Sequence, residues 1–384
     1  MRVLFIVNNF PTPDNPMDGI FNLRAAMAMR ERGHDVAVAR IAPHIPPWNK
    51  RWQRYRTVPA RYVVDGVPVR TLWGLMGPKR WAIGTLALQL RAAIDAQIEA
   101  FVPDVVHVQG LLPAGVLALG ARRPFVVTAH GSETYALVWR RRGLQSLARH
   151  VIERAGALAA VSGFVAANLD RLGARTVRVI YNGADEMIFE PRSRAASRAR
   201  LHVSADRPVL AFAANVVREK GVFELLDALE RLTPMAPVLL VAGAGEAQEA
   251  VSQRARARGL DVRMFGRLDQ PELADVLAAC DTFVLPSYAE GLPAAICEAM
   301  MMGRAVVASA VGGIPEILAS GRGMVVPSKD PPALAFALRS ILEDAALRRE
   351  CEQRARTFAV EHLTWRRNAL AYETLYQEVL TGTR

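Results

Sequence analysis

Short apolar runs alternate with helical patterns along the first half of the chain. Continuous apolar runs bounded by turn residues are typical of strands buried on both faces of a parallel sheet, and longer stretches with apolar residues at helical spacing indicate helices. We expect strands at Val3–Asn8, Val36–Arg40, Val105–Val108, Phe125–Ala129, Ala157–Val161 and Val177–Tyr181. We expect helices between them at Leu23–Arg32, Leu86–Ala100 and Leu144–Arg154.

The second half repeats this design. Its expected strands are Val209–Ala214, Val238–Ala242, Val262–Phe265, Thr282–Leu285, Ala305–Ala308 and Met324–Val326. The segment Glu190–Arg198 has the composition of a linker, and the last helical stretch, Thr364–Leu380, has no obvious place in the second sheet. The pattern predicts an α/β protein with two Rossmann-like domains, residues 1–188 and 189–363, and a C-terminal helix, 364–384, that packs back on the first domain. Ligands of open α/β sheets bind outside the carboxyl ends of the strands, so two facing sheets predict an active site in the cleft between the domains.

The excess of positive charge lies entirely in the first half. The net charge is +11, but residues 1–185 hold 24 Lys and Arg against 12 Asp and Glu, and residues 186–384 hold 24 against 25. Cations and aromatic residues are mixed in Pro46–Arg56, in Leu72–Trp81 and in Trp139–Arg142. Such asymmetry predicts an anionic partner, which is a membrane surface, a lipid phosphate or a nucleic acid, unless the arginines form only a solvated surface. The cations lie among Trp, Leu and Met on no recognised nucleic-acid fold, so we expect no nucleic-acid partner.

Nothing in the sequence predicts secretion or a bilayer-spanning helix. No apolar run approaches the ~20 residues that span a bilayer. The apolar start Met1–Val7 runs into Asn8-Asn9-Phe10-Pro11 with no small-residue cleavage site, so it is interpreted as a buried strand. Three cysteines, Cys280, Cys297 and Cys351, show no metal or redox spacing. We expect a cytoplasmic protein.

The segment that follows the expected strand Thr282–Leu285 carries the clearest chemistry. Gly291 permits an unusual backbone turn, and Pro293 suits a first helical turn because it has no amide hydrogen to satisfy there. The amides of Leu292, Ala294 and Ala295 would then point out of the helix start, together with the positive end of its dipole. This arrangement predicts a cradle for a diphosphate.

Two carboxylates flank this cradle. Glu290 precedes it, and Glu298 lies about a turn and a half into the helix. A carboxylate beside a diphosphate is repelled unless hydroxyl groups stand between them. Two acids around an anion site therefore indicate a sugar on one side and a ribose on the other. Taken alone, each residue has a simpler alternative: Glu290 as a helix cap and Glu298 as a solvent-facing acid.

These residues belong to a series of short sequence motifs that occur in the same order in the family-four retaining glycosyltransferases. The chain therefore resembles this family, which has the GT-B fold. The signature is Glu-Gly-x-Pro, a second Glu eight residues after the first, and Ala-Met-x-x-Gly. The other blocks are Gly19 and Gly33–Val36, Asp104–His107, Thr128–Gly131, Tyr181–Asp185, Lys220-Gly221, Gly243–Gly245, Val311–Glu316 and Met324–Pro327. The resemblance covers nearly the whole chain and implies a nucleotide-sugar donor, but it does not fix the sugar.

The resemblance also assigns roles to residues of the second half. Lys220 is expected to meet the negative charge that grows on the departing diphosphate. The family usually has an Arg where this chain has Asn215, which brings a hydrogen-bond donor but no charge; Arg218 is a candidate substitute. Backbone groups near Gly266 and Arg267 and in the Gly243 loop are expected to recognise the base, which leaves uracil and guanine both open.

In the first half, the resemblance places His130 beside the donor sugar, where it positions the ring through hydrogen bonds. His107 is expected to be structural, and Gly19 would let the loop after the first strand approach the phosphates or the acceptor. Gly243-Ala244-Gly245 lacks the third glycine of a dinucleotide fingerprint, so hydride transfer receives little support.

The expected function is transfer of a sugar, with retained configuration, from a UDP- or GDP-sugar to a hydroxyl of a lipid-linked or polysaccharide acceptor. No metal cluster, Asp-x-Asp motif or covalent nucleophile stands out, so we expect no cofactor and no metal. The leaving phosphate can itself take the acceptor's proton. We expect peripheral binding at the inner face of the cell membrane. The alternatives are a nucleotide-sugar epimerase on the same fold and a catalytically silent member of the family.

Overall fold

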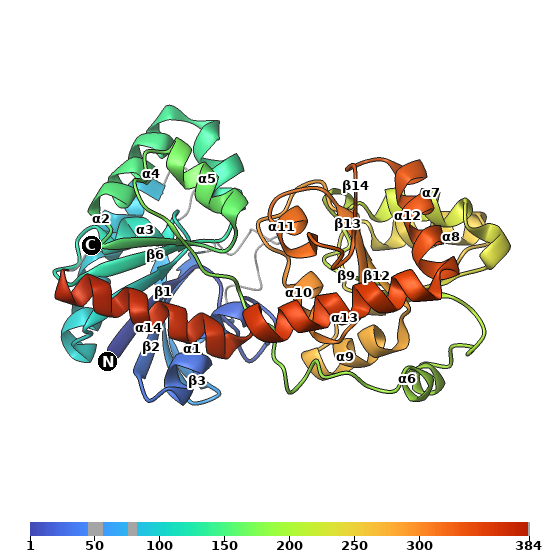
Figure 1. Cartoon of the computed structure of the whole chain (residues 1–384). Coiled ribbons are helices and arrows are strands. Elements are labelled where there is room, and N and C mark those ends of the chain that lie inside the picture. Colours follow the sequence, from blue (N-terminus) through green and yellow to red (C-terminus); the bar gives the residue numbers. More distant parts are fainter. Residues whose placement is uncertain (45–56, 76–82, 383–384) are drawn as a thin grey trace. The chain divides into compact units, whose positions relative to one another are not determined.

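The chain forms two compact units (Figure 1). The computed structural model describes residues 1–44, 57–75 and 83–382. Unit 1 comprises residues 1–182 with 365–384, and unit 2 comprises residues 183–364. The change of unit thus comes after Asn182, whereas the sequence pattern placed it after residue 188. Each unit contains one sheet of predominantly parallel strands, as the sequence predicted, with helices between the strands.

Unit 1 contains an eight-stranded sheet in the order β3-β4-β2-β1-β5-β6-β7-β8. Every neighbouring pair is parallel except β3 with β4. The strands are β1 (Arg2–Val7), β2 (Asp35–Pro43), β3 (Arg61–Val64), β4 (Val67–Gly74), β5 (Val105–Gln109), β6 (Phe125–Ala129), β7 (Ala157–Ala160) and β8 (Arg178–Val179). The α-helices are α1 (Ile20–Glu31), α2 (Ile83–Phe101), α3 (Ala114–Ala118), α4 (Arg142–Arg154), α5 (Gly163–Arg171) and α14 (Trp365–Thr381), and Glu133–Leu137 forms a π-helix.

Two features of this sheet differ from the sequence prediction. The antiparallel pair β3–β4 was not predicted. Exposed and half-buried residues alternate along β3, buried and more exposed residues alternate along the first part of β4, and the chain turns between them at Asp65-Gly66. The last strand, expected over Val177–Tyr181, is only the two-residue β8, and both of its side chains are exposed. A sheet edge needs no long apolar run, so apolar runs alone locate it poorly.

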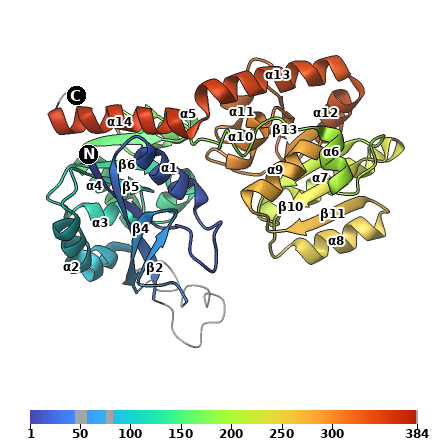
Figure 2. The same ribbon diagram turned by 90° about the horizontal axis from the view of Figure 1, so that it is seen from below.

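The C-terminal helix α14 belongs to unit 1, although the chain reaches it after unit 2. It lies beside α1 in both views (Figures 1 and 2). Tyr372 and Tyr376 are buried in the same core as β1 and α1. At the edge of this contact, Glu373 pairs with Arg32, and its Oε1 lies 3.0 Å from Nε2 of His34. Residues from the two ends of the chain therefore build one core.

Unit 2 contains a six-stranded parallel sheet in the order β11-β10-β9-β12-β13-β14. The strands are β9 (Val209–Ala213), β10 (Val238–Ala242), β11 (Asp261–Gly266), β12 (Thr282–Leu285), β13 (Ala305–Ser309) and β14 (Met324–Val326). The α-helices are α6 (Arg194–Arg200), α7 (Val222–Glu230), α8 (Gln248–Ala257), α9 (Gln270–Ala279), α10 (Ala294–Met301), α11 (Ile314–Leu318), α12 (Pro331–Glu343) and α13 (Ala345–His362).

The expected linker is partly a packed helix, so that prediction was wrong from residue 193 onward. Ser193 caps α6 through its side chain, which accepts the amide hydrogen of Ala196. Arg198 is buried and donates to Asp281 Oδ2 at 2.6 Å. The arginines that gave this segment a linker composition are thus ion-pair partners of unit 2.

The strand order of each sheet reverses once near its middle. In unit 2 the reversal lies between β9 and β12, and in unit 1 it lies between β1 and β5. Loops that leave the carboxyl ends of strands at such a reversal diverge and form the usual ligand-binding crevice of open α/β sheets. Candidate residues of each unit lie in these loops, and others lie in the loops after β6, β10 and β11 or, in the case of Glu298, on α10.

Candidate active site

An ion pair joins two of the predicted residues at the reversal point of unit 2. Lys220 ends a short 3-10 helix after β9, and Glu290 lies in the loop after β12. The Nζ atom of Lys220 lies 2.6 Å from Oε1 of Glu290. The Glu290 side chain is 9% exposed and that of Lys220 is 26% exposed. The fold therefore brings both charges to one partly open place.

Two left-handed glycines hold the Glu290 loop from either side. At Gly221, with φ of 71°, a Cβ atom would lie 1.9 Å from the carbonyl oxygen of Pro286. At Gly312, with φ of 59°, it would lie 1.9 Å from the carbonyl oxygen of Glu290. Any other residue at these two positions would displace backbone. The loop is therefore fixed by close backbone packing.

The turn before α10 differs in detail from the prediction. Gly291 does not have a positive φ; its carbonyl accepts the Gly313 amide at 2.9 Å. Pro293 is the residue before the helix and not part of its first turn. The first helical amides are those of Ala294 and Ala295, and the intrahelical pattern begins only at the next residue. These two amides stand at the positive end of the helix dipole.

The second predicted carboxylate, Glu298, lies on α10 and is 8% exposed. Leu292, which precedes the helix, is equally buried. Burial raises the pKa of the neighbouring Cys297 thiol to about 12, and the charge of Glu298 adds to this effect. The side chain of Glu298 thus lies in a poorly solvated region, and its contact with a ribose stays a prediction.

The predicted base-recognition loops lie against each other through their backbones. At Gly243 a Cβ atom would lie 1.8 Å from the carbonyl oxygen of Ala214, and the Gly243 amide donates to the carbonyl of Gly266 at 2.6 Å. Asn215 and Arg267 are exposed at the ends of these loops. The missing side chain of Gly243 is therefore required for packing within the protein.

A tyrosine that the sequence interpretation missed lies in the same loop as Glu290. Tyr288, in the loop after β12, donates its hydroxyl hydrogen to Glu224 at 2.7 Å. Burial and the carboxylate of Glu224 raise the pKa of Tyr288 to about 12. Arg218, the suggested substitute for the family arginine, is exposed and lies over the ring of Phe223 at 5.6 Å.

In unit 1, His130 follows β6 and is held in a neutral state. Its Nε2 atom lies 2.6 Å from Oε1 of Gln109, and its ring packs against Phe21. Burial lowers the pKa of His130 to about 4. An amide oxygen accepts only, so Nε2 carries the hydrogen and Nδ1 is left as an acceptor. Gln109, which ends β5, was not predicted.

A chain of hydrogen bonds connects this region to α14. The His107 ring lies between Tyr376, whose hydroxyl is 2.5 Å from Nδ1, and Thr128, whose Oγ1 is 2.8 Å from Nε2. The hydroxyl of Tyr372 lies 2.7 Å from the same Oγ1. Burial lowers the pKa of His107 to about 3. His107 is thus part of a buried polar network.

The His130 turn is fixed by a buried carboxylate, Glu133, which the sequence interpretation also missed. Its Oε1 atom accepts the His130 amide hydrogen at 2.7 Å. Burial raises the pKa of Glu133, and backbone N–H groups, among them those of His130, Gly131 and Leu111, oppose that shift. The three-residue spacing from His130 to Glu133, just after a strand, was the available signal.

Gly19 begins α1 with a left-handed φ of 68°. A Cβ atom there would lie 2.5 Å from the carbonyl oxygen of Asn9, and the same oxygen accepts a hydrogen bond from Asn22. The glycine is therefore needed for the fold of this loop, and a ligand contact is an additional hypothesis.

Two features are absent from the described part of the chain. No group of three or more His, Cys, Asp or Glu residues in 1–44, 57–75 and 83–382 has the arrangement of a metal site. Within the same ranges, no helix is long and apolar enough to cross a membrane.

Two family models match the chain in series. The model of Glycosyltransferase Family 4 matches residues 19–186, and that of Glycosyl transferases group 1 matches residues 193–358. D-inositol 3-phosphate glycosyltransferase of Nocardioides sp. is 32% identical over 78% of this chain and 74% of its own length. The chain belongs to the group 1, family 4 glycosyltransferases. A Bacillus subtilis (strain 168) relative whose name assigns it to teichuronic acid biosynthesis is 26% identical over 88% of each chain.

Solved structures agree with the predicted fold class. Sucrose-phosphate synthase from Thermosynechococcus elongatus has a TM-score of 0.83 at 22% identity over 100% of both chains. Anabaena HepE, in complex with UDP-glucose, has a TM-score of 0.75 at 21% identity, again over 100% of both chains. The GT-B fold is therefore confirmed for this family member.

Proposed function

We propose that this glycosyltransferase moves a sugar, with retained anomeric configuration, from a nucleotide-diphosphate sugar to a hydroxyl of a lipid-linked or polysaccharide acceptor. The observation that carries the proposal is the pair of Lys220 and Glu290, held 2.6 Å apart beside the start of α10. A cation, a carboxylate and free helical amides at one place match a diphosphate with a sugar attached.

The donor diphosphate would lie at the start of α10. The amides of Ala294 and Ala295 supply directed hydrogen bonds there, and the helix dipole favours negative charge. Lys220 supplies a compact positive charge that matters most when the sugar–phosphate bond breaks and the diphosphate gains charge. Glu290 holds this ammonium in place before the donor arrives. Glu298 would accept hydrogen bonds from the ribose hydroxyls.

In this proposal, His130 orients the sugar and does not transfer a proton. A base with a pKa of about 4 is neutral at pH 7 and a weak acceptor of protons. Its Nδ1 is available as a hydrogen-bond acceptor because Nε2 faces Gln109. The departing phosphate would take the proton of the acceptor hydroxyl. The acceptor attacks on the face that the diphosphate leaves, through an oxocarbenium-like ion pair.

A uridine or guanosine diphosphate donor is proposed. UDP as the nucleotide is supported by Anabaena HepE, a protein of the same fold that binds UDP-glucose. A panel of UDP- and GDP-sugars, tested for hydrolysis and transfer, tests the proposal. We expect NMR to show a product with the donor's anomeric configuration, at a rate unaltered by chelator. An inverted product or full inhibition by chelator would overturn the mechanism. A donor with a changed sugar would instead indicate an epimerase.

A cell-envelope or exopolysaccharide acceptor is supported by the relative named for teichuronic acid biosynthesis. The proposal adds that the enzyme works while bound peripherally to the inner face of the cell membrane. The excess of basic residues in 1–185 favours binding to an anionic membrane surface. The two most basic aromatic segments, within residues 46–56 and 72–81, lie largely outside the described residues. Leu75, directly before residues 76–82, is 61% exposed, and Leu88, on α2, is 81% exposed.

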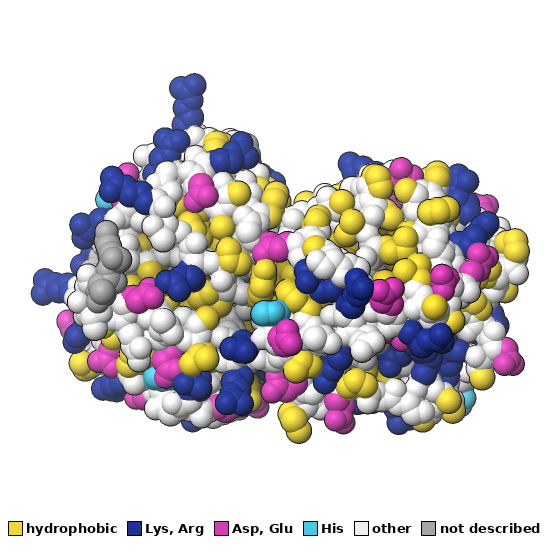
Figure 3. Space-filling model, viewed as in Figure 1, with side chains coloured by type: hydrophobic (Ala, Val, Ile, Leu, Met, Phe, Trp, Pro, Cys, Tyr) yellow, Lys and Arg dark blue, Asp and Glu magenta, His cyan; other side chains and the backbone are white. Residues whose placement is uncertain are grey.

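The face drawn in Figure 3 shows Lys and Arg side chains interspersed with Asp and Glu on both units, and not as one basic block. The membrane proposal therefore rests on the two segments themselves. Each Lys or Arg near an anionic surface contributes about 1 kcal/mol. Replacement of Lys50, Arg51, Arg54 and Arg56 by Ser should release the protein from anionic vesicles at low salt and spare donor hydrolysis. Vesicle binding that is absent, or indifferent to these substitutions, would overturn the proposal.

A further inference from the structure

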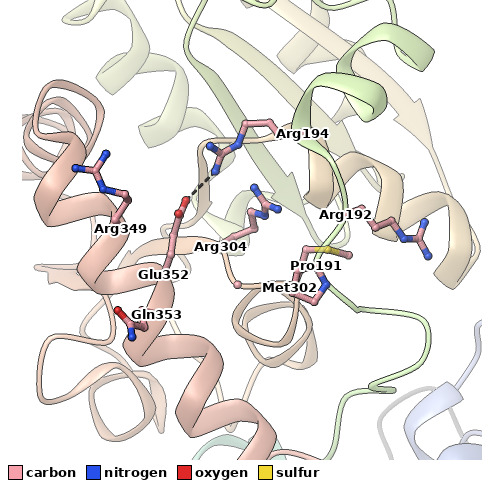
Figure 4. A pocket seen from close by; sticks show the side chains of 9 residues that line it. Pro191, Arg192, Arg194, Met302, Arg304, Arg349, Glu352 and Gln353 are labelled. Atoms are coloured by element: carbon pink, nitrogen blue, oxygen red, sulfur yellow. Dashed lines mark hydrogen bonds and ion pairs between the residues drawn. The ribbon is translucent and has the colours of Figure 1, made fainter.

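A cluster of arginines lies in unit 2 at the amino ends of the strands, whereas the candidate donor loops follow their carboxyl ends. It surrounds an open pocket of about 430 Å³ (Figure 4). Arg304 immediately precedes β13, and Arg194 begins α6 and donates to the carbonyl oxygen of Cys280, just before β12. The donor loops leave the other ends of these strands. The strands are four and five residues long, so roughly 15 Å separate the two places.

Arg304 is the most unusual lining residue. It is 6% exposed, and its buried Nε atom has no hydrogen-bond partner among the described residues. Its one hydrogen bond within this part of the chain, from Nη1 to the carbonyl of Cys280, is long at 3.5 Å. Burial of a guanidinium group with so few acceptors costs free energy, and an anion in the pocket that Arg304 lines would offset part of this cost. Figure 4 shows its guanidinium directed toward Arg194 and Glu352 in the middle of the pocket.

The other lining arginines are only partly neutralised. Arg194 donates to Glu352 at 2.7 Å, and Arg192 donates to Asp275 at 2.8 Å. Arg349, on α13, is exposed and makes no ion pair or hydrogen bond with the described residues. The pocket and its direct ion-pair partners hold four arginines against three carboxylates: Arg192, Arg194, Arg304 and Arg349, with Asp275, Asp281 and Glu352. The local charge is therefore positive, in a unit whose overall charge is close to zero.

We propose that this pocket binds a small anion that carries two or more phosphate charges. Planar guanidinium groups bind phosphate oxygens in pairs, which fits a cluster of arginines better than a cluster of lysines. No aromatic residue is among its lining residues, so nothing there would stack a nucleobase. The volume exceeds the need of a single phosphate and suits a diphosphate or a phosphorylated sugar. The site is distinct from the donor site at the carboxyl ends of the same strands.

The experiment is calorimetric titration of the full chain with inorganic pyrophosphate at low salt. We expect binding that weakens as salt rises.

Arg304→Gln should raise the dissociation constant about tenfold or more, since hydrogen bonds from a charged donor are the strong ones. Arg349→Gln should raise it about fivefold. Arg349 is exposed and forms no ion pair or hydrogen bond with the described residues, so this variant decides the matter if Arg304→Gln does not fold. Arg231→Gln is the matched control, because Arg231 is an exposed arginine of unit 2 outside the pocket, and binding should not change.

A parallel titration of Lys220→Ala separates this pocket from the donor loops. We expect pyrophosphate binding to persist in that variant with its sensitivity to Arg349→Gln. Three results would overturn the proposal: no binding to the unmodified chain, loss of binding in Lys220→Ala with no effect of Arg349→Gln, or an effect of Arg231→Gln equal to that of Arg349→Gln.

Discussion

The candidate residues of the two units are held in place by different kinds of interaction. In unit 2, Lys220 and Glu290 form a partly exposed ion pair between loops that close backbone packing fixes. In unit 1, His130 ends a chain of neutral hydrogen bonds that begins on α14 and passes through the buried His107 ring. A charged pair thus lies where the proposal puts the diphosphate, and the His130 ring that would orient the sugar contacts the neutral side chains of Gln109 and Phe21.

This difference predicts different consequences for substitutions. A partly exposed ion pair contributes little to folding, because solvent screens it, but its cation is available to a ligand. A buried neutral network contributes to stability and loses it when a member becomes charged. Substitutions in the unit 2 site should therefore change turnover or donor affinity. Changes of charge in the unit 1 network should change the free energy of unfolding and its dependence on pH.

Lys220→Ala should produce the largest effect. Loss of a preorganised charge at the departing diphosphate lowers kcat about 10²-fold or more. Steady-state kinetics with the preferred donor measures this, and Arg231→Ala, which removes an exposed cation of the same unit, should leave kcat unchanged. A rise in KM alone would refute the leaving-group role of Lys220.

Glu298→Ala should weaken donor binding about tenfold or more, since hydrogen bonds to a charged acceptor contribute about 1.5–3 kcal/mol. The measurement is the dissociation constant of the nucleotide diphosphate, by calorimetry. Because Glu298 is buried, circular dichroism must first show that the variant is folded. Unchanged affinity in a folded variant would contradict the contact with the ribose.

The free energy of unfolding should fall as pH drops from about 6.5 toward 4. The folded-state pKa values of His130 and His107, about 4 and about 3, lie below the ordinary value of 6.5, so the unfolded chain binds more protons in this window. The raised pKa of Glu133 opposes this trend at lower pH. Urea unfolding at several pH values should show a shallower dependence in His130→Gln, which keeps Glu133. An identical slope in both proteins would show that His130 is not held neutral.

Asn215→Arg should have the smallest effect, because the residue is exposed at the end of its loop. It restores the residue that the family usually carries, so we expect donor turnover to rise a few fold, about as much as one exposed charge contributes. Turnover of the donor in single-substrate assays measures it. A fall in activity would show instead that this chain uses asparagine for a purpose of its own.

The strands could be predicted because strands buried on both faces are uninterrupted apolar runs; Phe125–Ala129 and Val238–Ala242 have the predicted bounds. The pair β3–β4 was missed although Asp65-Gly66, between alternating residues, is a hairpin signal. The helix α6 could not be found from composition. The arginines of this segment give it the composition of a solvated linker. Their ion-pair partners, Asp275, Asp281 and Glu352, lie far away in the sequence and are brought close only by the fold.

Candidate site residues within a recognisable sequence motif could be predicted. The residues that hold them in place could not. Lys220 and Glu290 were named from separate blocks, and the fold brings them together. Gln109 and Tyr376 were missed, because their contacts with His130 and His107 join residues far apart in the sequence. The glycines were recognised, but not the backbone atoms that make them necessary: Gly19 and Gly243 face protein carbonyls.

The return of α14 to unit 1 has a consequence for synthesis of the chain. The bond partner of His107, Tyr376, follows it by 269 residues. At ~5–20 residues per second, a ribosome needs roughly 15–50 s to make that stretch. During this time the nascent first unit exposes the apolar surface that α14 will cover, while unit 2 can already fold. The final helix thus acts as a late closing element, and a chain that ends before residue 365 would leave unit 1 as a target for chaperones and proteases.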